Sequence, residues 1–126
     1  MCSSDLVVAL CGDGGFLMNS QELETAKRVG ANVVVVVWRD DGYGLIDWKQ
    51  RNEFGKPFGV DFGNPDLVAY ARSFGIAGFR VASAADLRST LERAFAVPGP
   101  ALVEVPIDYR ENLRLTERLG ALTGGA

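Results

Sequence analysis

The chain has 126 residues, of which 48% are hydrophobic and 23% are charged, and these proportions predict one compact domain over 1–126. It contains no histidine, which excludes Ser-His-Asp catalysis, Cys-His catalysis and histidine-ligated zinc within this chain. Its 13 basic and 16 acidic side chains give a formal net charge of −3 without any block of Lys and Arg, so we expect no nucleic-acid partner.

The first predicted strand covers Leu6 to Leu10, a short and continuously apolar run that we expect to be buried. It ends at a glycine-rich breaker, Gly12-Asp13-Gly14-Gly15. Residues 1–6 have two interpretations: a short disordered start, or a non-native stretch, because residues 2–6 resemble the translation of a sequencing-adapter end. The second interpretation implies that the protein continues upstream of this chain.

A helix and a second strand are predicted after the breaker. Asn19 as the N-cap and Glu22 at the third helical position predict a helix that stops at Gly30. Val33 to Trp38 is an apolar run of six residues without alternation, which is typical of a central strand covered on both faces.

No apolar run of the chain is longer than these six residues, and a membrane span needs roughly 20 residues, so we expect no membrane partner. The first residues contain no basic n-region and no apolar stretch of signal-peptide length, and the two cysteines make no disulfide framework, so we expect a cytoplasmic location.

Two helices are predicted in the middle of the chain. Leu45 to Asn52 is expected to form the first, which is short. Asn64 as the N-cap, with Pro65 at the first helical position and Asp66 in the first turn, opens the second, which Gly75 closes. The apolar residues of this second helix recur at helical spacing and are Leu67, Tyr70, Ala71 and Phe74.

The last predicted elements are a strand, a helix and a strand. Phe79 to Val81 is a short strand, Ser83 with Asp86 caps a helix, and Ala101 to Val105 is an apolar strand. The apolar stripe of the helix consists of Leu87, Leu91, Ala94 and Phe95. A polar tail is expected over 110–126. This alternation predicts an α/β domain with a mostly parallel sheet sandwiched between helices.

Two acidic, glycine-containing loops follow the first two predicted strands. Asp13 lies just beyond the first strand, and Asp40 lies just beyond the second, 27 positions later. A right-handed crossover between parallel strands brings both loops to the carboxyl edge of the sheet, where open α/β folds bind ligands. Glycines let the backbone approach a phosphate closely, and one or two carboxylates can hold Mg²⁺. The pair of loops therefore indicates a site for a Mg²⁺-bound diphosphate.

Either loop alone is weak evidence, because a Gly-Asp-Gly-Gly string is usually a turn and Asp-Asp-Gly is usually a solvated loop. It is the spacing across a strand-helix-strand unit that favours a site. Other phosphate motifs fit poorly, since Leu17 stands where the dinucleotide fingerprint needs its third glycine and the chain has no P-loop sequence. A non-catalytic domain that binds Mg²⁺ or a nucleotide is one alternative.

The chain resembles a known family from about Val7 to Leu115. Its paired motif is similar to the thiamine diphosphate motif of thiamine-dependent enzymes, and most closely to that of the acetolactate synthase large subunit, the catabolic type in particular. The segments that carry the resemblance are Gly12–Phe16, Glu22–Ala26, Asp40–Ile46, Val60–Asp66, Ala71 with Phe74-Gly75, Gly99–Ala101, and Val105–Tyr109 with Asn112. The resemblance implies the fold of the C-terminal pyrophosphate-binding domain of that enzyme.

The resemblance also implies a cofactor, a metal and their ligands. Mg²⁺ would be held by the side chains of Asp13 and Asp40 and by the backbone carbonyl of Gly42. The residues expected to contact thiamine diphosphate are Gly12, Asp13, Gly14, Gly15, Asp40, Gly42, Tyr43, Gly44, Leu45 and Ile46. Trp48 and Lys49 are expected near the substrate.

The reaction implied by the resemblance condenses two pyruvate molecules into 2-acetolactate and CO₂, with the cofactor carrying the hard chemistry. In that family the glutamate that activates the cofactor lies in a separate N-terminal domain. We therefore assign no catalytic residue in this chain and expect the chain alone to be inactive. The implied partners are the rest of the large subunit and a homodimer or tetramer partner. The use of FAD is left open, and FAD would bind elsewhere in the full-length enzyme.

Two residues depart from the pattern of the family. Arg39 replaces a small polar or apolar residue, and we expect this change to have no effect. Lys49 stands where acetolactate synthases often carry glutamine or tryptophan, which leaves the acceptor 2-oxo acid open. A further alternative is therefore another thiamine-dependent decarboxylase or carboligase that acts on a benzoylformate-like or indolepyruvate-like acid. The ending near Asp108-Tyr109 argues against that alternative.

Overall fold

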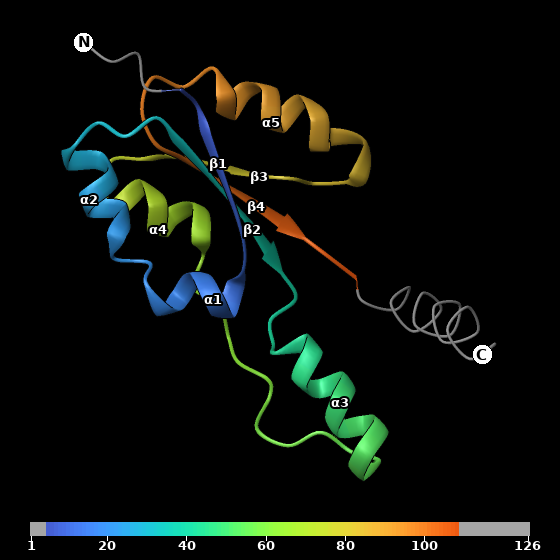
Figure 1. Ribbon diagram of the computed structural model, residues 1–126. Helices are drawn as coiled ribbons and strands as arrows, with labels where there is room; N and C mark the ends of the chain where they lie inside the picture. The colour runs from blue at the N-terminus through green and yellow to red at the C-terminus, as the bar shows by residue number, and fades with distance from the viewer. Residues whose placement is uncertain (1–4, 109–126) are drawn as a thin grey trace, which may run out of the picture.

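The computed structural model describes residues 5–108, and these contain a sheet of four parallel strands (Figure 1). The strands lie in the order β1-β2-β4-β3, with every neighbouring pair parallel. Their bounds are β1 (Val7–Gly12), β2 (Val33–Arg39), β3 (Ala77–Arg80) and β4 (Ala101–Pro106). The predicted α/β class with a parallel sheet is confirmed, and β2 has the interior position expected of it. The polar tail predicted over 110–126 lies outside the described residues.

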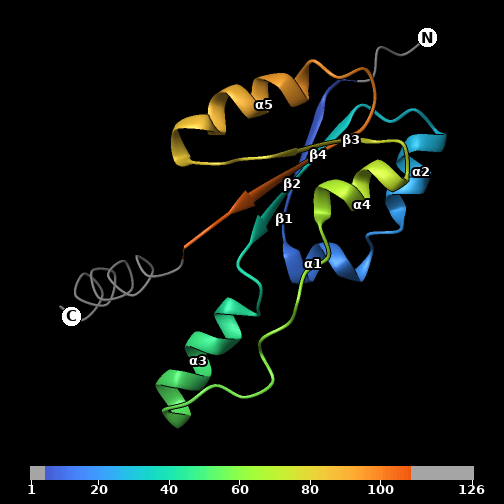
Figure 2. The same cartoon turned by 180° about the vertical axis from the view of Figure 1, so that it is seen from behind.

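Helices cover both faces of this sheet. Their bounds are α1 (Asp13–Met18), α2 (Glu22–Arg28), α3 (Gly44–Phe54), α4 (Leu67–Ser73) and α5 (Leu87–Phe95), with a 3₁₀ turn, η1 (Ala84–Asp86), before the last. Helices α1, α2 and α4 lie on one face and α5 lies on the other, while α3 projects away from the sheet (Figures 1 and 2). The sandwich of helices around the sheet is therefore confirmed, with α3 outside it.

The two faces of the sheet bury separate hydrophobic clusters because side chains alternate between the faces of a strand. The cluster under α1, α2 and α4 consists of Phe16, Leu23, Val37, Leu67, Ala71, Ile76 and Leu102. The cluster under α5 consists of Val34, Val36, Val81, Ala94, Ala101, Val103 and Val105. Strands β2 and β4 contribute to both clusters, which explains their continuous apolar sequences.

The first strand differs from its prediction in its exposure. Val7 and Leu10 are 56% and 65% exposed, although the apolar run over Leu6–Leu10 predicts a buried strand. The reason is the position of β1 at the edge of the described sheet, where β2 is its one neighbour. The strand does end at Gly12, the first residue of the predicted breaker. Helix α1, which was not predicted, begins directly after it at Asp13.

Three expectations about helix ends and packing are wrong. Gln21, and not Asn19, is the residue before α2. Asp66, and not Asn64, is the N-cap of α4, because its side chain accepts hydrogen bonds from the N–H groups of Val68 and Ala69. Phe95, predicted in the apolar stripe of its helix, is 39% exposed. Ser83 precedes the 3₁₀ turn η1, and its hydroxyl donates to the carboxylate of Asp86, but its side chain makes no cap hydrogen bond to the backbone.

Glycine 78 permits the close packing of β3 against α4. A Cβ atom at Gly78 would lie 2.9 Å from the carbonyl oxygen of Val68 and 3.1 Å from its Cα atom. Both are backbone atoms of a helix, so Gly78→Ala forces α4 to move. We expect the free energy of unfolding, measured with urea, to fall by about 1–3 kcal/mol. The control is Gly63→Ala, where a Cβ meets nothing within 4 Å; equal losses in both variants would contradict the prediction.

Candidate functional site

The loops that follow β1 and β2 meet at the carboxyl edge of the sheet, as their spacing predicts. Gly12 at the end of β1 pairs with Trp38 near the end of β2, so Asp13 and Asp40 begin neighbouring connections. The carboxylate Oδ2 of Asp13 accepts hydrogen bonds from the backbone N–H groups of Asp40 at 3.2 Å and Asp41 at 2.9 Å. A side chain from one loop thus holds the backbone of the other.

Asp13 is the buried centre of this site, with 1% of its surface exposed. Its Oδ2 atom also accepts a 2.6 Å hydrogen bond from Nδ2 of Asn64, so three donors share that oxygen. Its Oδ1 atom accepts the N–H of Gly14 at 2.8 Å. A carboxylate oxygen has two lone pairs, and Oδ1 therefore retains capacity for a cation.

The segment after α3 returns to support the β2–α3 loop, residues 40–43. Gly42 forms an antiparallel bridge with Asp61. The N–H of Tyr43 donates to the carbonyl of Val60 at 2.8 Å, and the Tyr43 and Phe62 rings lie 4.9 Å apart between centroids. The same return brings Asn64 between the two acidic loops.

Asn64 links the acidic loops through its amide group. Its Nδ2 donates to Asp13 and, at 2.8 Å, to Oδ1 of Asp41. These two acceptors fix the orientation of the amide, and Oδ1 of Asn64 is buried without a hydrogen-bond partner among the described residues. The sequence did not predict this role of Asn64, because the Asn-Pro-Asp string is typical of a helix cap.

Asp40 lies close to the negative charge of Asp13, and a cation bound between the two carboxylates would relieve their repulsion. Burial, then the negative charge of Asp13 and a hydrogen bond with its carboxylate, raises the pKa of Asp40 to about 6. Two carboxylates and the carbonyl of Gly42 form the hard oxygen set that Mg²⁺ prefers. Residues 5–108 contain no group of three or more His, Cys, Asp or Glu side chains suited to a metal, and the expected set has two such side chains plus a carbonyl. The donors fit Mg²⁺, although the role of each ligand stays a prediction.

The glycines of the first loop leave room beside the acidic pair. A Cβ atom at Gly12 or Gly15 would meet nothing within 4 Å, whereas at Gly14 it would lie 2.8 Å from Cε1 of Tyr43. Gly14 therefore lets the tyrosine ring pack against the start of α1. Open space next to Gly15, whose N–H lies in the first turn of the helix, is compatible with a bound phosphate.

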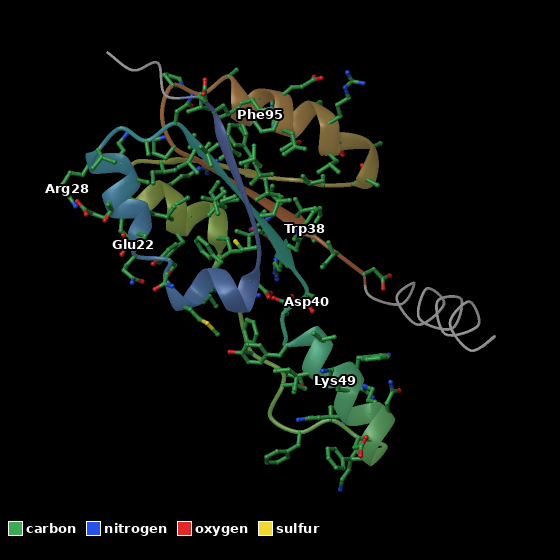
Figure 3. All side chains as sticks on the ribbon, viewed as in Figure 1. Glu22, Arg28, Trp38, Asp40, Lys49 and Phe95 are labelled. Atoms are coloured by element: carbon green, nitrogen blue, oxygen red, sulfur yellow. The ribbon has the colours of Figure 1, made fainter. Side chains whose placement is uncertain are left out.

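Helix α3 places the other predicted contact residues outside the core. None of its residues is buried, and Leu45 and Ile46 are 66% and 48% exposed. Trp48 is half-buried on the same helix. Lys49 is exposed there, and Figure 3 shows it away from the sheet. The structure brings Asp13, Asp40 and their glycines together, but it does not bring Trp48 or Lys49 into that group.

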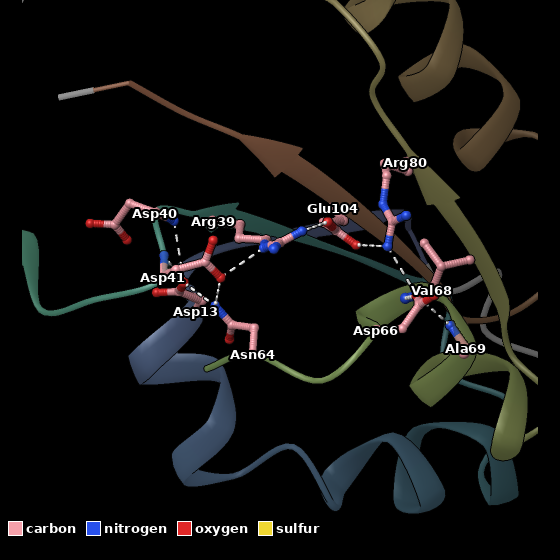
Figure 4. A network of polar contacts seen from close by, with 10 residues as sticks. All are labelled: Asp13, Arg39, Asp40, Asp41, Asn64, Asp66, Val68, Ala69, Arg80 and Glu104. Atoms are coloured by element: carbon pink, nitrogen blue, oxygen red, sulfur yellow. Dashed lines mark hydrogen bonds and ion pairs between the residues drawn. The ribbon is translucent and has the colours of Figure 1, made fainter. Parts of the chain in front are cut away.

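A second polar cluster adjoins the site and was not predicted. Glu104 is completely buried in β4 and forms ion pairs with Arg39 and Arg80, each at 2.9 Å. Arg39 also pairs with Asp41 at 2.9 Å (Figure 4). The hydrogen bonds from Arg39 and then Asn64 lower the pKa of Asp41. The sequence signal was one carboxylate inside an otherwise apolar strand, which is costly unless it is paired.

Comparison with known proteins identifies the family. The family described as "Thiamine pyrophosphate enzyme, C-terminal TPP binding domain" matches residues 2–105, and the chain belongs to it. The predicted resemblance to a thiamine diphosphate-binding domain is therefore confirmed, and the fold observed here is consistent with that domain.

The relatives of this chain include several acetolactate synthases. The catabolic acetolactate synthase of Raoultella terrigena is 45% identical over 113 residues, which are 90% of this chain and 20% of that protein. The acetolactate synthase of Bacillus subtilis (strain 168) is 43% identical over 86% of this chain and 19% of its own length. The probable acetolactate synthase large subunit of Methanocaldococcus jannaschii is 34% identical over 93% of this chain and 20% of that protein.

The chain thus spans about a fifth of the length of these relatives. Within residues 5–108, none of the helices has the length and apolar character that crossing a membrane requires.

Proposed function

We propose that this chain is the thiamine diphosphate- and Mg²⁺-binding domain of an acetolactate synthase, which condenses two pyruvate molecules into 2-acetolactate and CO₂. The observation that carries the proposal is the meeting of the Asp13 and Asp40 loops at the carboxyl edge of the sheet, in a chain of the thiamine pyrophosphate-binding family. The relatives named acetolactate synthase, at 45% and 43% identity, support this reaction over others of the family.

The residues of this chain would bind and orient the cofactor. Asp13, Asp40 and the carbonyl of Gly42 would hold Mg²⁺. Backbone groups of the glycines and of Tyr43 would contact the diphosphate, and the exposed side chains of Leu45 and Ile46 would lie against an apolar part of the cofactor. Thiamine diphosphate, when bound, supplies the carbanion chemistry of the reaction.

The full reaction would require partners outside this chain. We propose that the rest of the large subunit supplies the glutamate that activates the cofactor, that a homodimer or tetramer forms, and that this chain alone is inactive. Trp48 and Lys49 would lie near the substrate, where a lysine favours an anionic 2-oxo acid such as pyruvate. The cytoplasm would be the location of the enzyme, and FAD, where it is used, would bind elsewhere.

Calorimetry on the 126-residue chain tests the cofactor assignment. Thiamine diphosphate is titrated with Mg²⁺ and, separately, with EDTA; thiamine without its diphosphate is the matched control ligand. We expect binding with Mg²⁺ only, and none of thiamine, because the carboxylates repel a diphosphate unless a cation lies between them. Equal binding of thiamine, or binding that is indifferent to Mg²⁺, would refute the assignment. Tighter binding of ADP than of thiamine diphosphate would favour the nucleotide-binding alternative.

A further inference from the structure

The β2–α3 loop, residues 40–43, adopts a conformation that few residues accept. Asp41 has φ 59°, and it is the one non-glycine residue with a positive φ in the described part of the chain. Aspartate is among the residues that tolerate this left-handed backbone. The turn at Asp41 determines where Asp40 and the carbonyl of Gly42 point, because it lies between them.

The polar groups of Asp41 hold this turn. Its N–H donates to Asp13 at 2.9 Å, and its carbonyl accepts the N–H of Phe62 at 3.3 Å. Its side-chain Oδ1 accepts two charge-assisted hydrogen bonds, one from Nε of Arg39 at 2.9 Å and one from Nδ2 of Asn64 at 2.8 Å.

Arg39 is in turn held from inside the sheet. Its Nη1 donates to Oε1 of Glu104 at 2.9 Å, and Glu104 is 0% exposed. Glu104 lies on the interior strand β4, in register with Val37 of β2 and Arg80 of β3. Both oxygens of this carboxylate are paired, because Oε2 accepts from Nη2 of Arg80 at 2.9 Å.

We propose that Glu104 and Arg39 are positioning residues for the cation site. Glu104 fixes the guanidinium of Arg39, Arg39 fixes the carboxylate of Asp41, and Asp41 holds the turn that presents Asp40 and the Gly42 carbonyl (Figure 4). This inference rests on the proposed Mg²⁺ and thiamine diphosphate function. It also gives Arg39 a role, where the sequence predicted a substitution without effect.

Arg80 provides a matched control within the same cluster. It pairs with the same carboxylate at the same distance as Arg39. Its other partner, however, is Asp66 at the start of α4, far along the cluster from the β2–α3 loop (Figure 4). Arg39→Gln and Arg80→Gln therefore each remove one ion pair of Glu104, but Arg39→Gln alone releases Asp41.

The first test needs no ligand. Hydrogen exchange of backbone amides is followed by NMR in the 126-residue chain and in both variants. In Arg39→Gln we expect the amides of Asp41 and Tyr43, which are hydrogen-bonded in the loop, to exchange at least about tenfold faster, because local opening becomes easier. In Arg80→Gln we expect them to exchange as in the wild type. Equal acceleration in both variants, or none in Arg39→Gln, would overturn the proposal.

The second test measures Mg²⁺ affinity at a fixed concentration of thiamine diphosphate, beside thermal unfolding without ligand. Loss of a residue that orients a metal ligand typically weakens metal binding by about 10- to 100-fold, and we expect this for Arg39→Gln and Glu104→Gln. Arg80→Gln should change the Mg²⁺ affinity less than about twofold, even if its melting temperature falls as much as that of Arg39→Gln. Unchanged affinity in Arg39→Gln, or equal weakening in Arg80→Gln, would refute positioning.

If Arg39→Gln does not fold, Asp41→Asn replaces it, because asparagine also tolerates a left-handed backbone; normal Mg²⁺ affinity in that variant would overturn the proposal. If the wild-type chain binds no Mg²⁺ with thiamine diphosphate, the proposed function fails and the cation role with it. The amide exchange then decides separately whether Glu104 and Arg39 hold the loop.

Discussion

Asp13→Asn is expected to abolish the Mg²⁺-dependent binding of thiamine diphosphate, with an affinity loss of at least about 100-fold. Removing a residue that merely orients a metal ligand costs up to about that much, and Asp13 would be a ligand itself. The substitution keeps the size of the side chain but removes its charge and turns one acceptor oxygen into a donor. Calorimetry with thiamine diphosphate and Mg²⁺ measures the loss directly.

The same substitution is expected to destabilise the chain without any ligand. Three donors converge on Oδ2 of Asp13, from Asp40, Asp41 and Asn64, and a neutral amide satisfies them less well in either orientation. A buried donor left unpaired costs about 1–3 kcal/mol, so the urea midpoint should fall at unchanged slope.

Asp5→Asn is the matched control for Asp13→Asn, because Asp5 is exposed and precedes β1, at the end of the strand opposite Asp13. The identical chemical change there should leave both binding and stability as in the wild type. If Asp13→Asn loses stability yet binds the cofactor with unchanged affinity, Asp13 organises the loops and is not a ligand of the cation.

The sequence was sufficient to predict the meeting of Asp13 and Asp40, because that meeting follows from general rules. Two apolar strands joined by a helix pair in parallel, and the loops after them then lie at one edge. The rules need no knowledge of individual side-chain contacts. They therefore predicted which loops meet, but not what holds them together.

The supporting residues were not predictable in the same way. Asn64 contacts residues 51 and 23 positions away, and Glu104 contacts Arg39 across 65 positions. Such contacts leave no periodic pattern in the sequence. Locally, Asn64 resembles a helix cap and Arg39 a surface charge. Glu104 does carry a sequence signal, as a carboxylate within an apolar strand, but we did not use that signal in the prediction.

Exposure was the other feature that local patterns could not provide. The apolar run of β1 predicts a strand correctly, but strand order determines which strands lie at an edge, and strand order depends on the whole chain.

Helix α1 was not predicted because its two glycines, Gly14 and Gly15, disfavour a helix. The packing of Phe16 into the core outweighs that local preference.

Asp40→Asn is expected to have opposite effects on stability and on binding. Without metal, it should stabilise the chain relative to the wild type as the pH rises, but it should weaken the binding of Mg²⁺. In the chain without metal, the pKa of Asp40 is raised to about 6 by burial and by Asp13, from an ordinary value of 3.8. The folded state therefore binds more protons than the unfolded state between about pH 4 and 6. Stability from this group is full below pH 4 and is lost as the pH rises through 6.

Urea unfolding in EDTA at pH 4 and at pH 7.5 measures this difference. Asp40→Asn has no proton to lose at this position, so the variant should gain stability relative to the wild type as the pH rises from 4 to 7.5. Taking the difference between the two proteins cancels the titration of their shared groups. A difference that does not change with pH would show that the folded state does not raise the pKa of Asp40.

Mg²⁺ binding should depend on the protonation of the same carboxylate, but here the protonated form is the unfavourable one. A cation needs the ionised carboxylate, so wild-type affinity should fall by up to about tenfold per pH unit below pH 6. Asp40→Asn should bind Mg²⁺ weakly at every pH and lose this dependence. If the variant bound weakly but kept the wild-type slope, the competing proton would belong to another group, and Asp40 would be a ligand whose titration does not control the site.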